Sequence, residues 1–490
     1  MSFFGRVMYG YDDRYLLTVS ARADGSSKFT EGNQWGYFPS AAVSWTISNE
    51  SWMQGASGWL DNLKLRYSFG TAGNNNIPSG MTRLNFASFN TSWISQSDTY
   101  WSTVTDGGDT IMANEDLTWE TTLSHNIGLD WSLWKGRLSG SVELYHNTTK
   151  DLLIQFPTAG SGYEYQYRNM GSVQNKGIEV SLNAVLVETD NFGLTLGANV
   201  SLNKNLVTSL GDLDRIESET RWASSEAGTD FIVTTGQPLG NFYGFVSDGF
   251  YSADDFSWNG SSWVLNEGVV DCSAVIGSQY MRPGAMKLKD LTDDGKVTMD
   301  DKTIIGNAQP LGFGGFNLNG YAWGFDFSAN FNYVFGNDIY NANKIEFTSS
   351  RKYNNRNLMK TGEQRWTNID WNTGELITDV DQLREVNAGA ELWSPAVGNA
   401  VFSDWAVEDG SFLRLTSATI GYTLPSSLTM KAKISRLRVY VTGTNLFCLT
   451  NYSGYDPEVD TKRETPLTPG VDYSAYPKSI GFVVGLNLTF

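Results

Sequence analysis

One short stretch has the residue types and the spacing of a metal-binding loop. Oxygen-bearing side chains stand at Asp290, Thr292 and Asp294, Gly295 follows them, and Asp301 occupies the twelfth position. This is the spacing of the EF-hand calcium loop, in which the glycine lets the chain fold back so that the oxygens converge. The sequence therefore predicts a structural calcium ion held by Asp290, Thr292, Asp294 and Asp301.

Two departures from that pattern leave an alternative open. Thr292 stands where a carboxylate or amide is usual, and Asp301 replaces the bidentate glutamate at the last position. The alternative is an acidic turn within a loop, ordered by hydrogen bonds between aspartate side chains and nearby backbone amides. In the first interpretation the calcium ion is structural and pins a long loop.

The elements that must hold this loop are strands, and the last twelve residues show their pattern most clearly. One phase is apolar and the other is small or polar, apart from Val483, and the alternation continues to the terminal Phe490. A strand with one apolar face suits a wall between lipid and water. The apolar phase consists of Ile480, Phe482, Val484, Leu486, Leu488 and Phe490.

The same alternation predicts about thirteen strands of the length that a tilted membrane strand requires. Charged residues fall in the inward phase and are almost absent from the outward phase. This distribution indicates a water-filled lumen and argues against a soluble β-sandwich, whose inward face would be apolar. The charged inward positions are Arg22, Lys64, Arg66, Asp130, Glu143, Glu179 and Arg438. The predicted strands cover residues 4–11, 14–24, 38–48, 62–71, 120–133, 137–149, 174–187, 191–203, 315–323, 325–337, 411–424, 434–447 and 479–490.

The connections between these strands alternate between short and long. Bacterial outer-membrane barrels place short turns in the periplasm and long loops outside, so residues 204–314 and 338–410 are predicted to be long extracellular loops. The first strand then runs towards the periplasm, whereas a closed barrel of even strand number begins with an upward strand. We therefore expect residues 1–490 to be part of a larger barrel, which also accounts for an N-terminus without an export signal.

Composition narrows the class of protein further. The chain has 490 residues, and 18% of them are charged. Its formal charge of −18 and its pI near 4.6 argue against nucleic-acid binding. Cys272 and Cys448 lie far apart, so two free thiols are favoured over a disulfide. His125 and His146 fall in the outward phase near strand ends, where they suit the membrane interface better than a zinc site. No catalytic motif is recognisable, so the chain is predicted not to be an enzyme.

Several segments resemble the SusC/RagA-type TonB-linked outer-membrane transporters of Bacteroidetes. The resemblance implies a barrel of 22 strands, of which this chain would supply the C-terminal thirteen or so, without the plug and the TonB-contacting segment. It also implies bacterial outer-membrane lipid around the barrel, a SusD-like surface lipoprotein over its mouth, energy from the TonB complex, and oligosaccharides or peptides as cargo. The segments that resemble the family are residues 11–29, 35–40, 289–306, 407–425, 437–459 and 476–490.

Loop tryptophans bear on the cargo, because aromatic faces suit sugar rings. The alternative for each of them is packing among the loops. The residues concerned are Trp93, Trp101, Trp222, Trp258, Trp263, Trp366, Trp371, Trp393 and Trp405. Two other functions remain open from the residues alone: a passive porin-like channel, and a secreted soluble glycan-binding β-protein.

Overall fold

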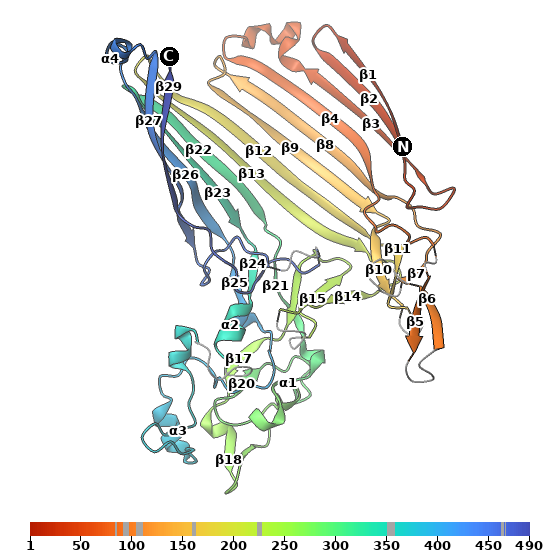
Figure 1. Cartoon of the computed structure of the whole chain (residues 1–490), viewed down its shortest axis with the longest axis vertical. Helices are drawn as coiled ribbons and strands as arrows, with labels where there is room; N and C mark the ends of the chain where they lie inside the picture. The colour runs from red at the N-terminus through yellow and green to blue at the C-terminus, as the bar shows by residue number, and fades with distance from the viewer. Residues whose placement is uncertain are drawn as a thin grey trace.

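The computed structural model is dominated by one antiparallel sheet of thirteen strands, which forms a curved wall (Figure 1). It describes residues 1–83, 86–91, 98–103, 111–158, 163–222, 228–349, 358–461, 465 and 467–490, with the backbone alone for 86–91, 98–103 and 157. In spatial order the strands are β1 (Ser2–Tyr11), β2 (Tyr15–Gly25), β3 (Trp35–Thr46), β4 (Leu60–Asn74), β8 (Glu120–Leu133), β9 (Leu138–Lys150), β12 (Ser172–Glu188), β13 (Phe192–Ser209), β22 (Gly312–Ala322), β23 (Phe325–Phe335), β26 (Phe412–Thr423), β27 (Arg436–Thr450) and β29 (Gly481–Thr489).

The prediction of an all-β antiparallel barrel wall is confirmed, and each predicted strand corresponds to one strand of this sheet. The main difference is length: β12 has 17 residues and extends beyond both predicted ends, and β13 has 18 and continues six residues past its predicted C-terminal end. Backbone pairing continues past the apolar alternation because hydrogen bonding between strands does not require lipid on either face. Among the described residues, β1 and β29 form the two edges of the wall.

Strand register sorts the side chains into rows on opposite faces, since directly paired residues point to the same side. One outward row contains Tyr67, Ile127, Leu144, Ile178 and Leu202, each paired with the next. The outward apolar side chains of β29 are largely exposed, with Val484 at 74%. A sheet face this apolar and this exposed suits lipid, so the predicted assignment of outward and inward phases holds.

Tight turns join the strands at one end of the wall. Trp134 and Lys135 have φ values of 55° and 60°, and Asp12 and Asp13 have 54° and 50°. Two successive left-handed residues form the type I′ turn, whose twist matches that of the paired strands. The long connections gather at the other end (Figure 1).

The long connections fold into small sheets and short helices. Among the described residues, no helix is long and apolar enough to span a membrane. The remaining strands are β5 (Phe86–Thr91), β6 (Asp98–Thr103), β7 (Ile111–Met112), β10 (Leu153–Pro157), β11 (Tyr165–Asn169), β14 (Arg215–Ser218), β15 (Phe231–Thr234), β16 (Asn241–Gly244), β17 (Ser247–Phe250), β18 (Phe256–Trp258), β19 (Trp263–Leu265), β20 (Met286–Leu288), β21 (Thr303–Asn307), β24 (Asp338–Asn341), β25 (Val407–Asp409) and β28 (Val471–Asp472). The α-helices are α1 (Ser273–Ile276), α2 (Ala342–Phe347), α3 (Val380–Val386) and α4 (Ser426–Thr429).

The described parts of the two longest connections, residues 210–311 and 336–411, pack against each other and share a hydrophobic core. Buried Phe245, Cys272 and Leu288 of the first lie in one cluster with Leu392 and Trp393 of the second. We call these two segments together the loop body. Its shared core means that neither connection can be understood as an independent loop.

Candidate functional site

The inward face of the wall carries many asparagine side chains, spread over several strands. Asn205 donates to Asn175 Oδ1 at 2.9 Å, and Asn319 donates to Asn317 Oδ1 at 2.8 Å. An amide side chain offers both donors and acceptors, so it can meet either a hydroxyl group or a peptide bond. The inward asparagines include Asn126, Asn147, Asn175, Asn183, Asn199, Asn203, Asn205, Asn317, Asn319, Asn330 and Asn332.

Charged residues on the same face neutralise one another. The guanidinium of Arg66 on β4 forms two 2.9 Å hydrogen bonds to Asp130 on β8, and Nη2 also donates to Glu143 on β9 at 2.7 Å. Arg438 on β27 pairs in the same way with Asp326 on β23. Paired guanidinium and carboxylate groups leave this part of the lumen polar without a strong local charge.

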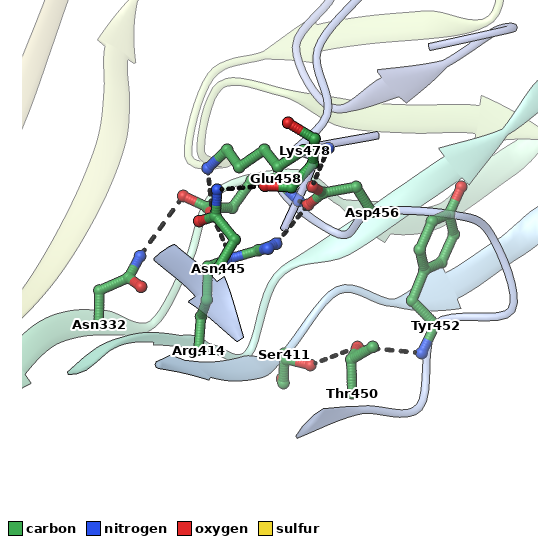
Figure 2. A network of polar contacts seen from close by, with 10 residues as sticks. Asn332, Ser411, Arg414, Asn445, Thr450, Tyr452, Asp456, Glu458 and Lys478 are labelled. Carbon is green, nitrogen blue, oxygen red and sulfur yellow. Dashed lines mark hydrogen bonds and ion pairs between the residues drawn. The ribbon is translucent and has the colours of Figure 1, made fainter. Parts of the chain in front are cut away.

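A denser ionic network lies near the end of the wall that bears the long connections (Figure 2). Arg414 on β26 contacts Asp456 Oδ1 at 2.5 Å through Nη2 and Glu458 Oε2 at 2.7 Å through Nε. Lys478 Nζ donates to the same Glu458 oxygen at 2.5 Å, and Asn332 reaches Glu458 Oε1 at 3.4 Å. The side chains of Arg414 and Asp456 are only 5% and 7% exposed. The network therefore fastens Asp456, Glu458 and Lys478 of the last long connection to the lumen face.

Sequence reasoning assigned no role to this network. Arg414 stands at an inward position of β26, and its partners Asp456, Glu458 and Lys478 lie in the connection that follows the neighbouring strand β27. An inward arginine at the end of the wall that bears the long connections, with acids in a connection at that same end, is the signal that could have found it. Which acids it meets depends on how the connection folds back, and alternation along a strand does not encode that.

The predicted calcium loop is compact, and three of its four residues come together. Thr292 Oγ1 lies 3.2 Å from Asp290 Oδ1 and 3.2 Å from Asp301 Oδ1. Asp294 instead accepts a hydrogen bond from the backbone amide of Lys296 at 2.9 Å. Gly295, with φ of 85°, donates to Asp290 Oδ2 at 2.7 Å, as the sharp turn requires.

Asp301 is fully buried and accepts hydrogen bonds from the backbone amides of Leu291, Thr292 and Thr298. Burial alone would raise the pKa of Asp301, but these hydrogen bonds outweigh it and hold the pKa below its usual value. In the described part of the chain, no group of three or more His, Cys, Asp or Glu side chains is placed to hold a metal. Calcium also takes hydroxyl and carbonyl oxygens, so calcium at Asp290, Thr292, Asp294 and Asp301 stays a prediction.

Most of the loop tryptophans are packing residues. Trp222, Trp366 and Trp393 are buried, and Trp258 and Trp263 pack against each other with ring centroids 5.4 Å apart. Trp405 packs on Trp393 at 4.6 Å. Trp371 is exposed, at 70%. Trp93 and the side chain of Trp101 lie outside the described part, so Trp371 is the described loop tryptophan best placed to meet a ligand.

The histidines and cysteines lie where the sequence placed them. His125 and His146 pair in register on the outward face, and Tyr67 Oη lies 2.9 Å from His125 Nδ1. Both cysteines are free, with Cys272 buried in the core of the loop body and Cys448 on β27. Burial raises the pKa of the Cys272 thiol, which makes it unreactive.

A lipid-facing outer surface, a polar inner surface and long connections at one end define the wall of an outer-membrane β-barrel. The family profile "TonB dependent receptor-like, beta-barrel" matches residues 1–309. The chain belongs to this family of outer-membrane receptors.

Individual relatives match along the whole chain. TonB-dependent receptor P3 of Formosa agariphila is 30% identical over 495 residues, and TonB-dependent receptor SusC of Bacteroides thetaiotaomicron is 28% identical over 500 residues. The matches cover 100% of this chain and 45% and 44% of those proteins, so the chain spans less than half of their length. The solved RagAB peptide transporter matches with a TM-score of 0.77 and 27% identity, over 100% of this chain and 47% of that one.

Proposed function

We propose that this chain forms the C-terminal barrel wall of an energy-coupled importer that carries oligosaccharides or peptides across the outer membrane. The observation that carries the proposal is the continuous match to the RagAB peptide transporter, in which every part of this chain has a counterpart. The inward asparagines support it, since their amides suit sugar hydroxyls and peptide groups equally.

The relatives also suggest the partners. In this proposal a SusD-like surface lipoprotein covers the mouth of the barrel, and the TonB complex supplies energy through a part of the receptor outside residues 1–490. The loop body gives such a lid a folded platform, because its two segments share a buried core. Burial of Trp222, Trp366 and Trp393 weakens the argument that loop tryptophans bind sugar. The proposal therefore includes peptides and oligosaccharides equally as cargo.

The alternative of a secreted soluble β-protein is wrong, because proteins of this family lie in the outer membrane and the outward face of the sheet is apolar and exposed. A passive porin-like channel remains the second candidate, because the wall alone suits both functions. Conductance of the gene product that contains this chain separates them in planar lipid bilayers. We expect a nearly closed pore, since an energy-coupled importer of this class has a plugged lumen. A steady open-channel conductance would support the porin and contradict import.

A further inference from the structure

Four basic or ionisable residues form one row across four paired strands. These strands, β8, β9, β12 and β13, are neighbours near the centre of the wall (Figure 1). His125 on β8 pairs with His146 on β9, His146 pairs with Lys176 on β12, and Lys176 pairs with Lys204 on β13. Directly paired residues share a face, so all four side chains belong to the same side of the sheet. We call them the basic row.

The basic row lies on the lipid face, just beyond the apolar band. The outward residues of β13 from Leu194 to Leu202 are all apolar and span about the nine residues that cross a bilayer in a tilted strand. Lys204 is the next outward position, towards the end of the wall that bears the long connections. In bacterial outer-membrane barrels that end faces outside. The row therefore lies at the depth of the lipid headgroups of the outer leaflet.

The row has no counter-ion within the described chain. Like charges placed directly opposite each other destabilise a pair of strands, and Lys176 and Lys204 are placed in this way. Neither lysine forms an ion pair with any described residue, and both are exposed. The next outward positions, Thr148, Gln174 and Leu206, carry no carboxylate. An isolated interfacial lysine needs no ligand, but a cross-strand pair of them in a chain of charge −18 calls for an external anion.

A shallow groove of about 670 Å³ runs beside the row. Its lining includes His146, Lys176 and Lys204 together with the outward apolar side chains Leu144, Ile178 and Leu202. Cationic groups next to apolar ones match a ligand with an anionic head and hydrocarbon chains. We propose that the basic row and this groove bind the phosphate-bearing headgroup and the first acyl segments of a lipid of the outer leaflet.

The test compares lipid binding by the complete receptor, purified in detergent, using native mass spectrometry. The probes are a phosphorylated diglucosamine glycolipid (lipid A), the same lipid after dephosphorylation, and inorganic phosphate. The variant Lys176→Gln/Lys204→Gln removes two charges from the row. Lys431→Gln/Lys433→Gln is the matched control, because it removes the same charge at the opposite end of the wall. Lys176→Arg/Lys204→Arg keeps the charge and should bind as the unmodified protein does.

The unmodified receptor and the control should bind the phosphorylated lipid about tenfold more tightly than the dephosphorylated one, because each lysine near an anionic surface contributes to binding. The glutamine pair should lose most of that preference while still showing the heat-modifiable band of a folded barrel. Equal binding of both lipids, or an unchanged preference in the glutamine pair, would overturn the proposal. Inorganic phosphate that binds as tightly as the lipid would also overturn it, since the acyl groove would then contribute nothing.

Discussion

Replacing Arg414 by alanine is expected to release Asp456 and Glu458, and with them the last long connection, from the lumen wall. The substitution leaves the buried carboxylate of Asp456 without its guanidinium partner, and the loss of one member of a buried ion pair costs about 3–5 kcal/mol. Hydrogen exchange in the 456–478 segment should therefore become much faster, and trypsin should cleave beside Lys478 more readily. The strands of the wall should keep their protection, because the barrel pairing does not depend on this network.

The matched control is Arg22→Ala, which removes an arginine whose side chain is 56% exposed and whose partner Asp24 is two residues away. An exposed ion pair of this kind is worth at most about 1 kcal/mol, so exchange in residues 456–478 should not change. Arg414→Lys keeps one charge but loses the second contact, and should give an intermediate result. Unchanged exchange in Arg414→Ala would show that the last connection is held by other contacts.

The stability of the loop body is expected to fall as the pH rises from about 4.5 to about 8. Asp230 is fully buried, and burial raises its pKa from 3.8 to about 6. Its carboxyl oxygens accept hydrogen bonds from Thr220, from the backbone amide at 2.9 Å and from the hydroxyl at 2.5 Å. These bonds and the charge of Lys302 lower the pKa, but less than burial raises it.

A carboxyl group whose pKa is higher in the folded state binds more protons there than in the unfolded state. Its stabilising contribution is complete below the unfolded pKa, near 3.8, and is lost as the pH rises through about 6. The expected loss is roughly 2 kcal/mol over this range. It is measured as the opening free energy from hydrogen exchange in β15 and β16, with intrinsic exchange rates corrected for pH.

The variant Asp230→Asn tests whether Asp230, and not another titrating group, causes the pH dependence. The amide keeps an acceptor for the Thr220 backbone and carries no charge, so the pH dependence in β15 and β16 should largely disappear. Strand β4, outside the loop body, serves as an internal reference in the same experiment. A pH dependence that persists in the asparagine variant would assign the effect to another group.

The sheet could be predicted from the sequence because its signal is local. Apolar and polar residues alternate at every second position of β13 and β29, and Arg66, Asp130 and Glu143 could be placed on the inward face from that alternation alone. Pairing in register then follows from burying one face in lipid. Alternation within each strand does not show that His146, Lys176 and Lys204 lie side by side. That alignment follows only from the register between the strands.

The long connections could not be predicted in this way, because their contacts join residues far apart in the chain. Strand β24 pairs with β25, at the far end of the same connection, and with β28, which belongs to the last connection. Trp222 donates to Tyr340 Oη at 2.5 Å across 118 positions, so its burial has no signature in the neighbouring sequence. Tryptophan content therefore suggested a sugar surface where the structure has a core.

Uptake by whole cells tests the account most directly. Labelled peptides and oligosaccharides are offered to cells that carry the intact gene and to cells in which it is deleted, each with and without a protonophore. We expect one of the two cargo classes to enter only with the gene present, and that uptake to stop when the proton gradient is dissipated. Gene-dependent uptake that continues with the protonophore would identify a passive channel and contradict energy-coupled import.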